Sequence, residues 1–137
     1  MILLQKYYYI TFSCIVFFVA FFSFLFLCYI FITKLVIFIA NVTFEPACRN
    51  NWHIHHSTKD GGQILICVDG EGWYQEEGKE AQSLKEGDVV VIPANVKHWH
   101  GAKKNSWFSH LAIEVPGENT SNEWCEPVTD EEYNKLS

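Results

Sequence analysis

The pattern of residues 41–116 limits this chain to one class of fold. Short apolar runs, such as 63–68 and 89–92, are separated by groups of Gly, Pro, Asp and Asn, such as 60–62, 69–72 and 87–88. Runs of this length bounded by turn residues are typical of strands, and no helical periodicity appears among them. Because such strands bury their apolar side chains only against one another, the spacing predicts an all-β sandwich or barrel.

The first forty residues have a different composition. They hold nine of the eleven Phe and only two charges, Lys6 and Lys34. Residues 10–32 carry no charge and are long enough to cross a bilayer as a helix, which takes about 20 residues. We therefore expect a hydrophobic N-terminal helix within residues 1–40. It is either a single transmembrane anchor, which predicts a membrane location, or a segment added by a gene-model or frame error, which leaves the protein cytoplasmic.

Charge and cysteine content exclude several classes of function for residues 41–137. This part holds all sixteen Asp and Glu against eight Lys and Arg. Nucleic-acid binding depends on cationic side chains that neutralise phosphates, so we expect no nucleic-acid partner. The five Cys are singly spaced and odd in number, which indicates neither a disulfide framework nor a structural zinc site.

A group of histidines carries the strongest functional signal in the sequence. His53 and His55 are two residues apart on an expected strand, so their side chains share one face. His98 follows the turn at 87–93 and reaches the interior from another strand, while Gln63 opens a third strand and could add an amide oxygen. Three imidazoles and one neutral oxygen suit a divalent transition metal, with manganese, iron, nickel and zinc all open. A site without a carboxylate leaves the metal its full charge, which favours a Lewis-acid role.

Two further histidines are candidates for proton transfer. His100 shares a strand face with His98, and His110 shares one with the small residue Ala112. We expect either imidazole to act as a general acid or base, with a pKa near the usual value of about 6.5, or to make structural hydrogen bonds. His56 faces away from His53 and His55 and is assigned to the surface.

These residues carry a resemblance to the cupin superfamily. Its first motif resembles the stretch from His53 to Gly70, and its second resembles the stretch from Gly87 through Pro93 to His98. Two positions depart from the usual pattern: Gln63 stands where most members have a glutamate ligand, and Asn95 stands where they have glycine. Asparagine also tolerates a positive φ angle.

The chain is similar in particular to small single-domain bacterial cupins, including manganese-dependent hydroxynitrile lyases and cupins associated with carboxymuconolactone decarboxylases. The resemblance implies a jelly-roll-like antiparallel β-barrel over residues 41–116 and a manganese site held by three His and one Gln. It also implies pocket positions for His100 and His110, and a lyase reaction on a small carbonyl or cyanohydrin molecule. A complete barrel would favour a homo-oligomer.

Other functions remain open at this stage. The chain could be a non-catalytic sensor or ligand-binding cupin, with or without a membrane tether. It could also be a truncated and inactive fragment, because the Phe-rich segment occupies the place of the first barrel strands. Residues 117–137 form a polar tail, in which Thr129 and Glu132 predict a capping box and a short helix. We expect this tail to pack loosely or to be mobile.

Overall fold

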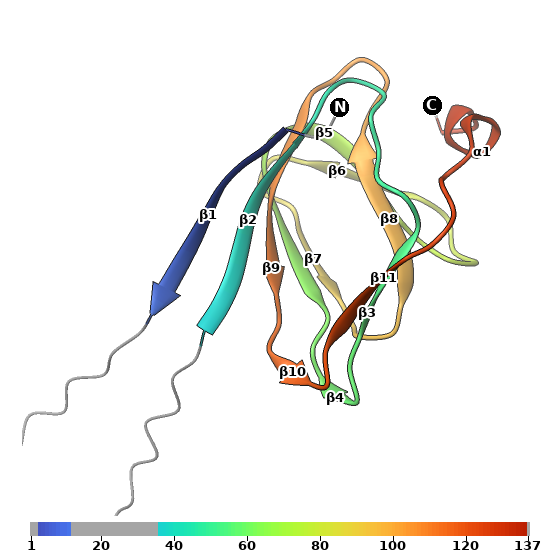
Figure 1. The fold of residues 1–137 in the computed structure, drawn as a ribbon. Coiled ribbons are helices and arrows are strands. Elements are labelled where there is room, and N and C mark those ends of the chain that lie inside the picture. Colours follow the sequence, from blue (N-terminus) through green and yellow to red (C-terminus); the bar gives the residue numbers. More distant parts are fainter. Residues whose placement is uncertain (1–2, 12–35, 137) are drawn as a thin grey trace, which may run out of the picture.

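The computed structural model describes residues 3–11 and 36–136 of the chain. Within these ranges the backbone forms eleven strands and one short helix (Figure 1). The elements are β1 (Leu3–Thr11), β2 (Val36–Phe44), β3 (His53–His56), β4 (Lys59–Asp60), β5 (Gln63–Glu76), β6 (Gln82–Lys85), β7 (Val89–Ile92), β8 (Lys97–Ala102), β9 (Phe108–Glu114), β10 (Gly117–Glu118), β11 (Ser121–Trp124) and α1 (Asp130–Asn134). The predicted all-β class is confirmed.

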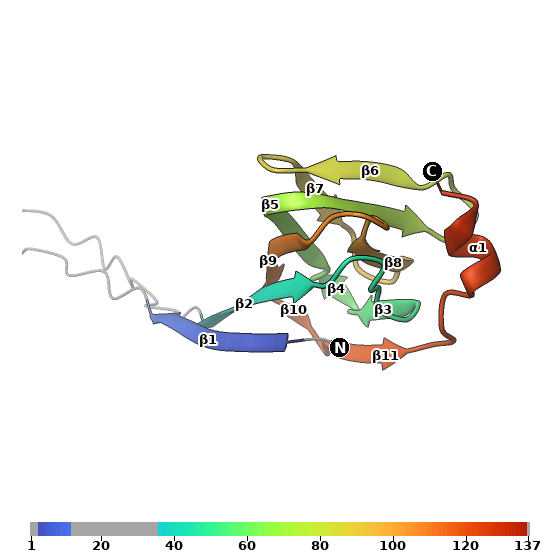
Figure 2. The same cartoon turned by 90° about the horizontal axis from the view of Figure 1, so that it is seen from above.

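The strands form one curled antiparallel sheet. Its order is β1-β2-β9-β5-β8-β3-β11, with β6 and β7 also paired to β5, while β4 and β10 make a separate two-stranded ladder. Figure 2 shows how the sheet bends round on itself. The Asn122 amide on β11 donates a hydrogen bond to the Glu114 carboxylate on β9 at 3.0 Å, so strands far apart in the sheet order meet again across the interior.

Strand β5 connects the two halves of this sheet. We expected a turn at 69–72, and that prediction is wrong, because β5 continues through this stretch with only a bulge between Cys67 and Asp69. Gly70 has a φ of +72° there, which only glycine adopts freely, and a Cβ on Gly72 would lie 2.5 Å from the Phe108 ring. The glycines therefore bend a strand and admit a close neighbour, and β5 pairs with β9 before the bend and with β8 after it.

The N-terminal segment is extended where the structure describes it. Strand β1 pairs with β2, and β2 begins five residues before the strand start that we expected at residue 41. The prediction of a helix is therefore wrong for residues 3–11 and 36–40. Most of the predicted membrane-spanning run 10–32, namely residues 12–32, lies outside the described residues. No helix within the described ranges is long and apolar enough to cross a membrane.

Strand alternation places the core and the histidines on the same side of the sheet. Along β5 and β9, every second side chain is buried, and these include Leu65, Cys67, Phe108 and Ala112. Burying each large apolar side chain stabilises the fold by about 2–3 kcal/mol. His110 lies between Phe108 and Ala112 in the same row, so the strand that builds the core also carries a candidate site residue inward.

The C-terminal tail is an ordered part of the fold. The predicted capping box is present: Thr129 caps α1, its hydroxyl accepts from the Glu132 backbone N–H, and the Glu132 carboxylate accepts from the Thr129 backbone N–H. The expectation of loose packing is wrong. Tyr133 on α1 is only 2% exposed and joins a cluster with Trp52, Trp99 and Val128. Strand β11 pairs along β3, which carries the first two candidate metal ligands.

Candidate metal centre

Three of the predicted ligands come together in the interior. His53 and His55 point inward from β3, and β8 places His98 directly opposite His53 in the antiparallel register. All three side chains are buried, and one ring nitrogen from each lies within 4.8 Å of the others. Three imidazole nitrogens at this separation can bind one divalent transition metal.

Backbone hydrogen bonds orient two of these rings. His53 donates from Nδ1 to the Asn51 carbonyl at 3.0 Å, and His98 donates from Nδ1 to the Val96 carbonyl at 2.9 Å. Each bond fixes the proton on Nδ1 and leaves the Nε2 lone pair free for a metal. Among the described residues, Nε2 of His55 and of His98 has no hydrogen-bond partner although it is buried. Unpartnered buried acceptors of this kind fit a bound cation.

Gln63, the predicted fourth ligand, has a buried amide oxygen. Its side chain is buried on the interior face of β5, in the same row as Leu65 and Cys67. Its Oε1 atom has no hydrogen-bond partner within the described part of the chain. A buried amide oxygen without a partner costs free energy, so Gln63 has the chemistry of a fourth ligand. That role stays a prediction.

His100 and His110 form a second pair beside the three predicted ligands. The His100 ring lies 5.4 Å from His53 and 4.7 Å from His110, measured between centroids. His110 is fully buried and stacks between Phe44 at 5.8 Å and Phe108 at 5.1 Å. Neither ring nitrogen of His110 has a partner among the residues that the structure describes. The structure thus places His100 beside the predicted ligand His53 and His110 beside His100.

Burial changes the expected protonation of these histidines. We expected pKa values near 6.5, but burial lowers the pKa of His110 to about 4 and that of His98 to about 4. Burial and the neighbouring His98 lower the pKa of His53 to about 3, and burial lowers that of His100 well below the usual value. All four imidazoles are therefore neutral at neutral pH, which is the form that binds a metal or accepts a proton.

Three residues at the site were not found from the sequence. Asn50 accepts a hydrogen bond from the His100 backbone N–H at 3.0 Å, and its amide nitrogen lies 3.1 Å from His100 Nε2. Asn122 and Trp124 lie on β11 opposite His55 and His53, and the Trp124 and His53 rings are 4.9 Å apart. Neither the loop residue Asn50 nor the exposed polar strand β11 has an apolar pattern that could have revealed it.

Comparisons with known proteins agree with this arrangement. Residues 40–113 match the family described as Cupin domain. The (R)-mandelonitrile lyase of Granulicella tundricola is 43% identical over 96 residues, which cover 70% of each chain. This chain belongs to the cupin family.

Two solved structures are also similar. A cupin-like protein from Thermotoga maritima is 45% identical, with a TM-score of 0.65, and the match covers 74% of this cupin and 73% of that chain. A Klebsiella pneumoniae protein with a double-stranded β-helix domain is 19% identical, with a TM-score of 0.58 over 66% of this cupin and 75% of that chain. The second likeness shows the fold alone.

The pattern around the cupin motifs is also explained by the structure. Asn95, which replaces the usual glycine, has a φ of +65°. Its side-chain oxygen accepts a hydrogen bond from the Ser57 backbone N–H, and its side-chain nitrogen donates one to the Ser57 carbonyl. His56 points outward as expected, because its ring bonds the Glu123 carboxylate at 2.7 Å. That contact is the main cause of a raised pKa for His56.

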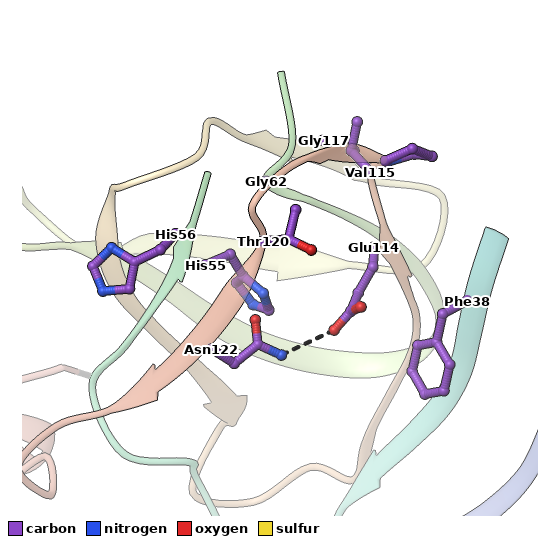
Figure 3. Close-up of a pocket in the computed structure, with 10 residues that line it drawn as sticks. Phe38, His55, His56, Gly62, Glu114, Val115, Gly117, Thr120 and Asn122 are labelled. Carbon is purple, nitrogen blue, oxygen red and sulfur yellow. Dashed lines mark hydrogen bonds between the residues drawn. The ribbon is translucent and has the colours of Figure 1, made fainter. Parts of the chain in front are cut away.

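A pocket of about 270 Å³ opens beside His55, one of the three predicted histidine ligands (Figure 3). His55 lies in its wall, together with Glu114 on β9 and Asn122 on β11, whose amide donates a hydrogen bond to the Glu114 carboxylate at 3.0 Å. Phe38 on β2 lines another side. The pocket therefore offers a small molecule a route toward His55.

The buried neutral histidines predict how stability depends on pH. The unfolded chain binds protons near pH 6.5, whereas folded His98 and His110 bind them only near pH 4. The metal-free cupin is therefore most stable above about pH 6.5 and loses up to about 3 kcal/mol per histidine as the pH falls to about 4. Urea unfolding across this range measures the loss, and His110→Phe should reduce it. A free energy of unfolding that does not change with pH would contradict the burial of these rings.

Proposed function

We propose that this cupin is a metal-dependent lyase that cleaves a small cyanohydrin-type molecule into a carbonyl compound and a leaving group. The observation that carries the proposal is the buried pair His100 and His110 next to three histidines whose ring nitrogens lie within 4.8 Å of one another. The 43% identity to a protein named (R)-mandelonitrile lyase supports the same class of reaction. Mandelonitrile is therefore the first substrate to test.

The metal site in this proposal is made of His53, His55, His98 and Gln63. A divalent metal bound there would act as a Lewis acid that polarises a substrate oxygen. The resemblance to manganese-dependent lyases makes manganese the first metal to load, while iron, nickel and zinc suit the same nitrogen donors. No carboxylate belongs to this donor set, so the charge of the metal is not neutralised by its ligands.

The histidine pair would move the proton. In cyanohydrin cleavage the hydroxyl O–H bond breaks, the carbonyl double bond forms, and the C–CN bond breaks with its electron pair on cyanide. His110, with two unpartnered ring nitrogens, would hold the hydroxyl proton and return it to cyanide as hydrogen cyanide. Its low pKa makes it a weak base, which suits a proton that must be given back. Asn50 would hold His100 in place beside it.

An activity assay with the manganese-loaded chain tests this proposal. The absorbance of benzaldehyde measures the cleavage of (R)-mandelonitrile. We expect this cleavage to depend on the metal and to stop when a chelator removes it. His100→Ala and His110→Ala should each lower kcat by a factor of about 100 or more, which is the usual contribution of general acid–base catalysis. Glu86→Gln, on the exposed turn between β6 and β7, is the control and should leave kcat unchanged.

The assay can also reject the proposal. A chain that binds manganese stoichiometrically but neither cleaves cyanohydrins nor adds cyanide to benzaldehyde is not a lyase of this type. Binding of small carbonyl compounds by such a chain would instead support a ligand-binding cupin.

A further inference from the structure

The pocket in Figure 3 has an acidic side chain, but no Lys or Arg, on the part of its lining that the structure describes. Glu114 is the only acidic residue among the ten described residues that line it. Its carboxylate is half-buried at the end of β9 and accepts one hydrogen bond, from the Asn122 amide at 3.0 Å. His56 also lines the pocket, and its ring is paired with the Glu123 carboxylate at 2.7 Å, so among the described residues Glu114 is the charged group of the lining that has no partner of opposite charge.

Glu114 is close enough to influence the candidate metal centre without belonging to it. Burial lowers the pKa of His55, and the Glu114 carboxylate is the largest influence in the opposite direction. Glu114 is nevertheless not part of the group whose ligand atoms lie within 4.8 Å of one another. Its charge therefore acts on molecules in the pocket and on the centre through space.

An anion in this pocket would be subject to two opposing electrostatic forces, one from a bound metal ion and one from Glu114. A dication held only by neutral ligands attracts every small anion, including carboxylates that resemble the products of nitrile and aldehyde chemistry. A carboxylate on the pocket wall repels the same anions, and the low-dielectric surroundings strengthen that repulsion. Both charges act much more weakly on a neutral alcohol, nitrile or aldehyde than on an anion.

We propose that Glu114 determines the substrate specificity of this cupin by excluding anionic ligands from the pocket and leaving it open to neutral ones. This inference rests on the proposed metal site. It assigns to the pocket a preference for neutral hydroxyl and carbonyl compounds over carboxylates of the same size. The hydrogen bond from Asn122 holds the charge toward the pocket, since its partner Glu114 would otherwise be free to turn to solvent.

A pair of matched ligands tests the inference without an activity assay. Benzoate and benzamide have the same shape and differ in charge, and their binding to the cobalt-loaded full chain can be followed by the visible spectrum of Co²⁺. Glu114→Gln removes the charge but keeps an oxygen that can accept from Asn122. We expect this variant to bind benzoate about tenfold more tightly than the unmodified chain, with benzamide binding changed by less than about twofold.

Controls separate a local charge from the overall charge of the protein. Glu118→Gln removes one negative charge from an ion pair with Lys59, outside the pocket lining. This variant should bind benzoate and benzamide as tightly as the unmodified chain does. High salt should reduce the difference that Glu114→Gln makes, because ions screen a partly exposed charge. Equal effects of Glu114→Gln on benzoate and benzamide, or no effect on either, would overturn the inference.

The same experiment distinguishes this inference from the proposed lyase function. If no cobalt binds, both the metal site and the role of Glu114 are rejected. If cobalt binds and Glu114→Gln selectively tightens benzoate binding, the role of Glu114 holds even when no cyanohydrin is cleaved.

Discussion

Replacing His98 by alanine is expected to yield a folded protein that no longer retains a divalent metal on purification. His98 is the predicted ligand that β8 brings to the two predicted ligands on β3, and its ring lies 4.2 Å from His53 and 5.6 Å from His55. Its loss leaves His53 and His55 on the short strand β3 and the amide oxygen of Gln63 on β5. Because changes to residues that merely orient metal ligands already cost about 10–100-fold in affinity, we expect a loss of more than about 100-fold. Metal analysis and calorimetric titration with Mn²⁺ measure it.

A thermal measurement provides an independent check on the same variant. Metal that binds only the folded state stabilises it by about 2.7 kcal/mol when present at about 100 times its Kd. The Tm of the unmodified chain should therefore fall when the metal is chelated, whereas the Tm of His98→Ala should not respond. His56→Ala, on the outward face of β3, is the matched control and should keep the metal. Stoichiometric metal in His98→Ala would rule out the three-histidine site.

Tyr133→Ala is expected to destabilise the protein by about 3–5 kcal/mol, as is usual when a buried aromatic side chain is removed. The Tyr133 hydroxyl donates to the Ala102 carbonyl at 2.7 Å, and the ring packs edge-on to Trp99 at 6.2 Å. The Arg49 guanidinium lies 4.4 Å above the same ring and also donates to the Val128 carbonyl at 2.9 Å. One side chain therefore fastens α1 to the end of β8 and to the loop before β3.

Urea unfolding of two variants separates the contributions of the Tyr133 ring and hydroxyl. Tyr133→Phe keeps the ring and removes the hydrogen bond to Ala102, so its cost should be about 1–3 kcal/mol. A free energy of unfolding for Tyr133→Ala within about 1 kcal/mol of the unmodified chain would mean that the helix does not pack as described. In a tail that only rested on the surface, neither substitution would matter.

The sequence was sufficient to predict the positions of residues that depend on local spacing along the chain. His53 and His55 share a face because strands alternate, and the capping box of Thr129 and Glu132 acts within one helical turn. His98 could be placed because the motif from Gly87 to Pro93, which contains strand β7, is followed directly by strand β8. The buried, unpartnered oxygen of Gln63 agrees with the role that the family resemblance suggested, although its place as a ligand remains to be measured.

The errors arose where one residue type serves two structures or where pairing is non-local. Gly70 and Gly72 indicate a turn in sequence, yet they bend a continuous strand and make room for Phe108. Asn122 and Trp124 are exposed, so no apolar alternation marked β11, and its pairing with β3 spans most of the domain. The lowered pKa values of the histidines were also missed, because they depend on burial by residues from several strands.

The pairing of β11 with β3 has a consequence for the order in which the site is made. Of the strands that the structure describes, β11 is synthesised last, and until it emerges the outer edge of β3 has no partner. An unpaired edge is open to other chains, and here it belongs to the strand that carries two of the predicted metal ligands, His53 and His55. A nascent or C-terminally nicked chain would thus expose the backbone of this edge to pairing with other chains, beside predicted ligands that all precede β11. Completing translation both closes that edge and places Trp124 over His53.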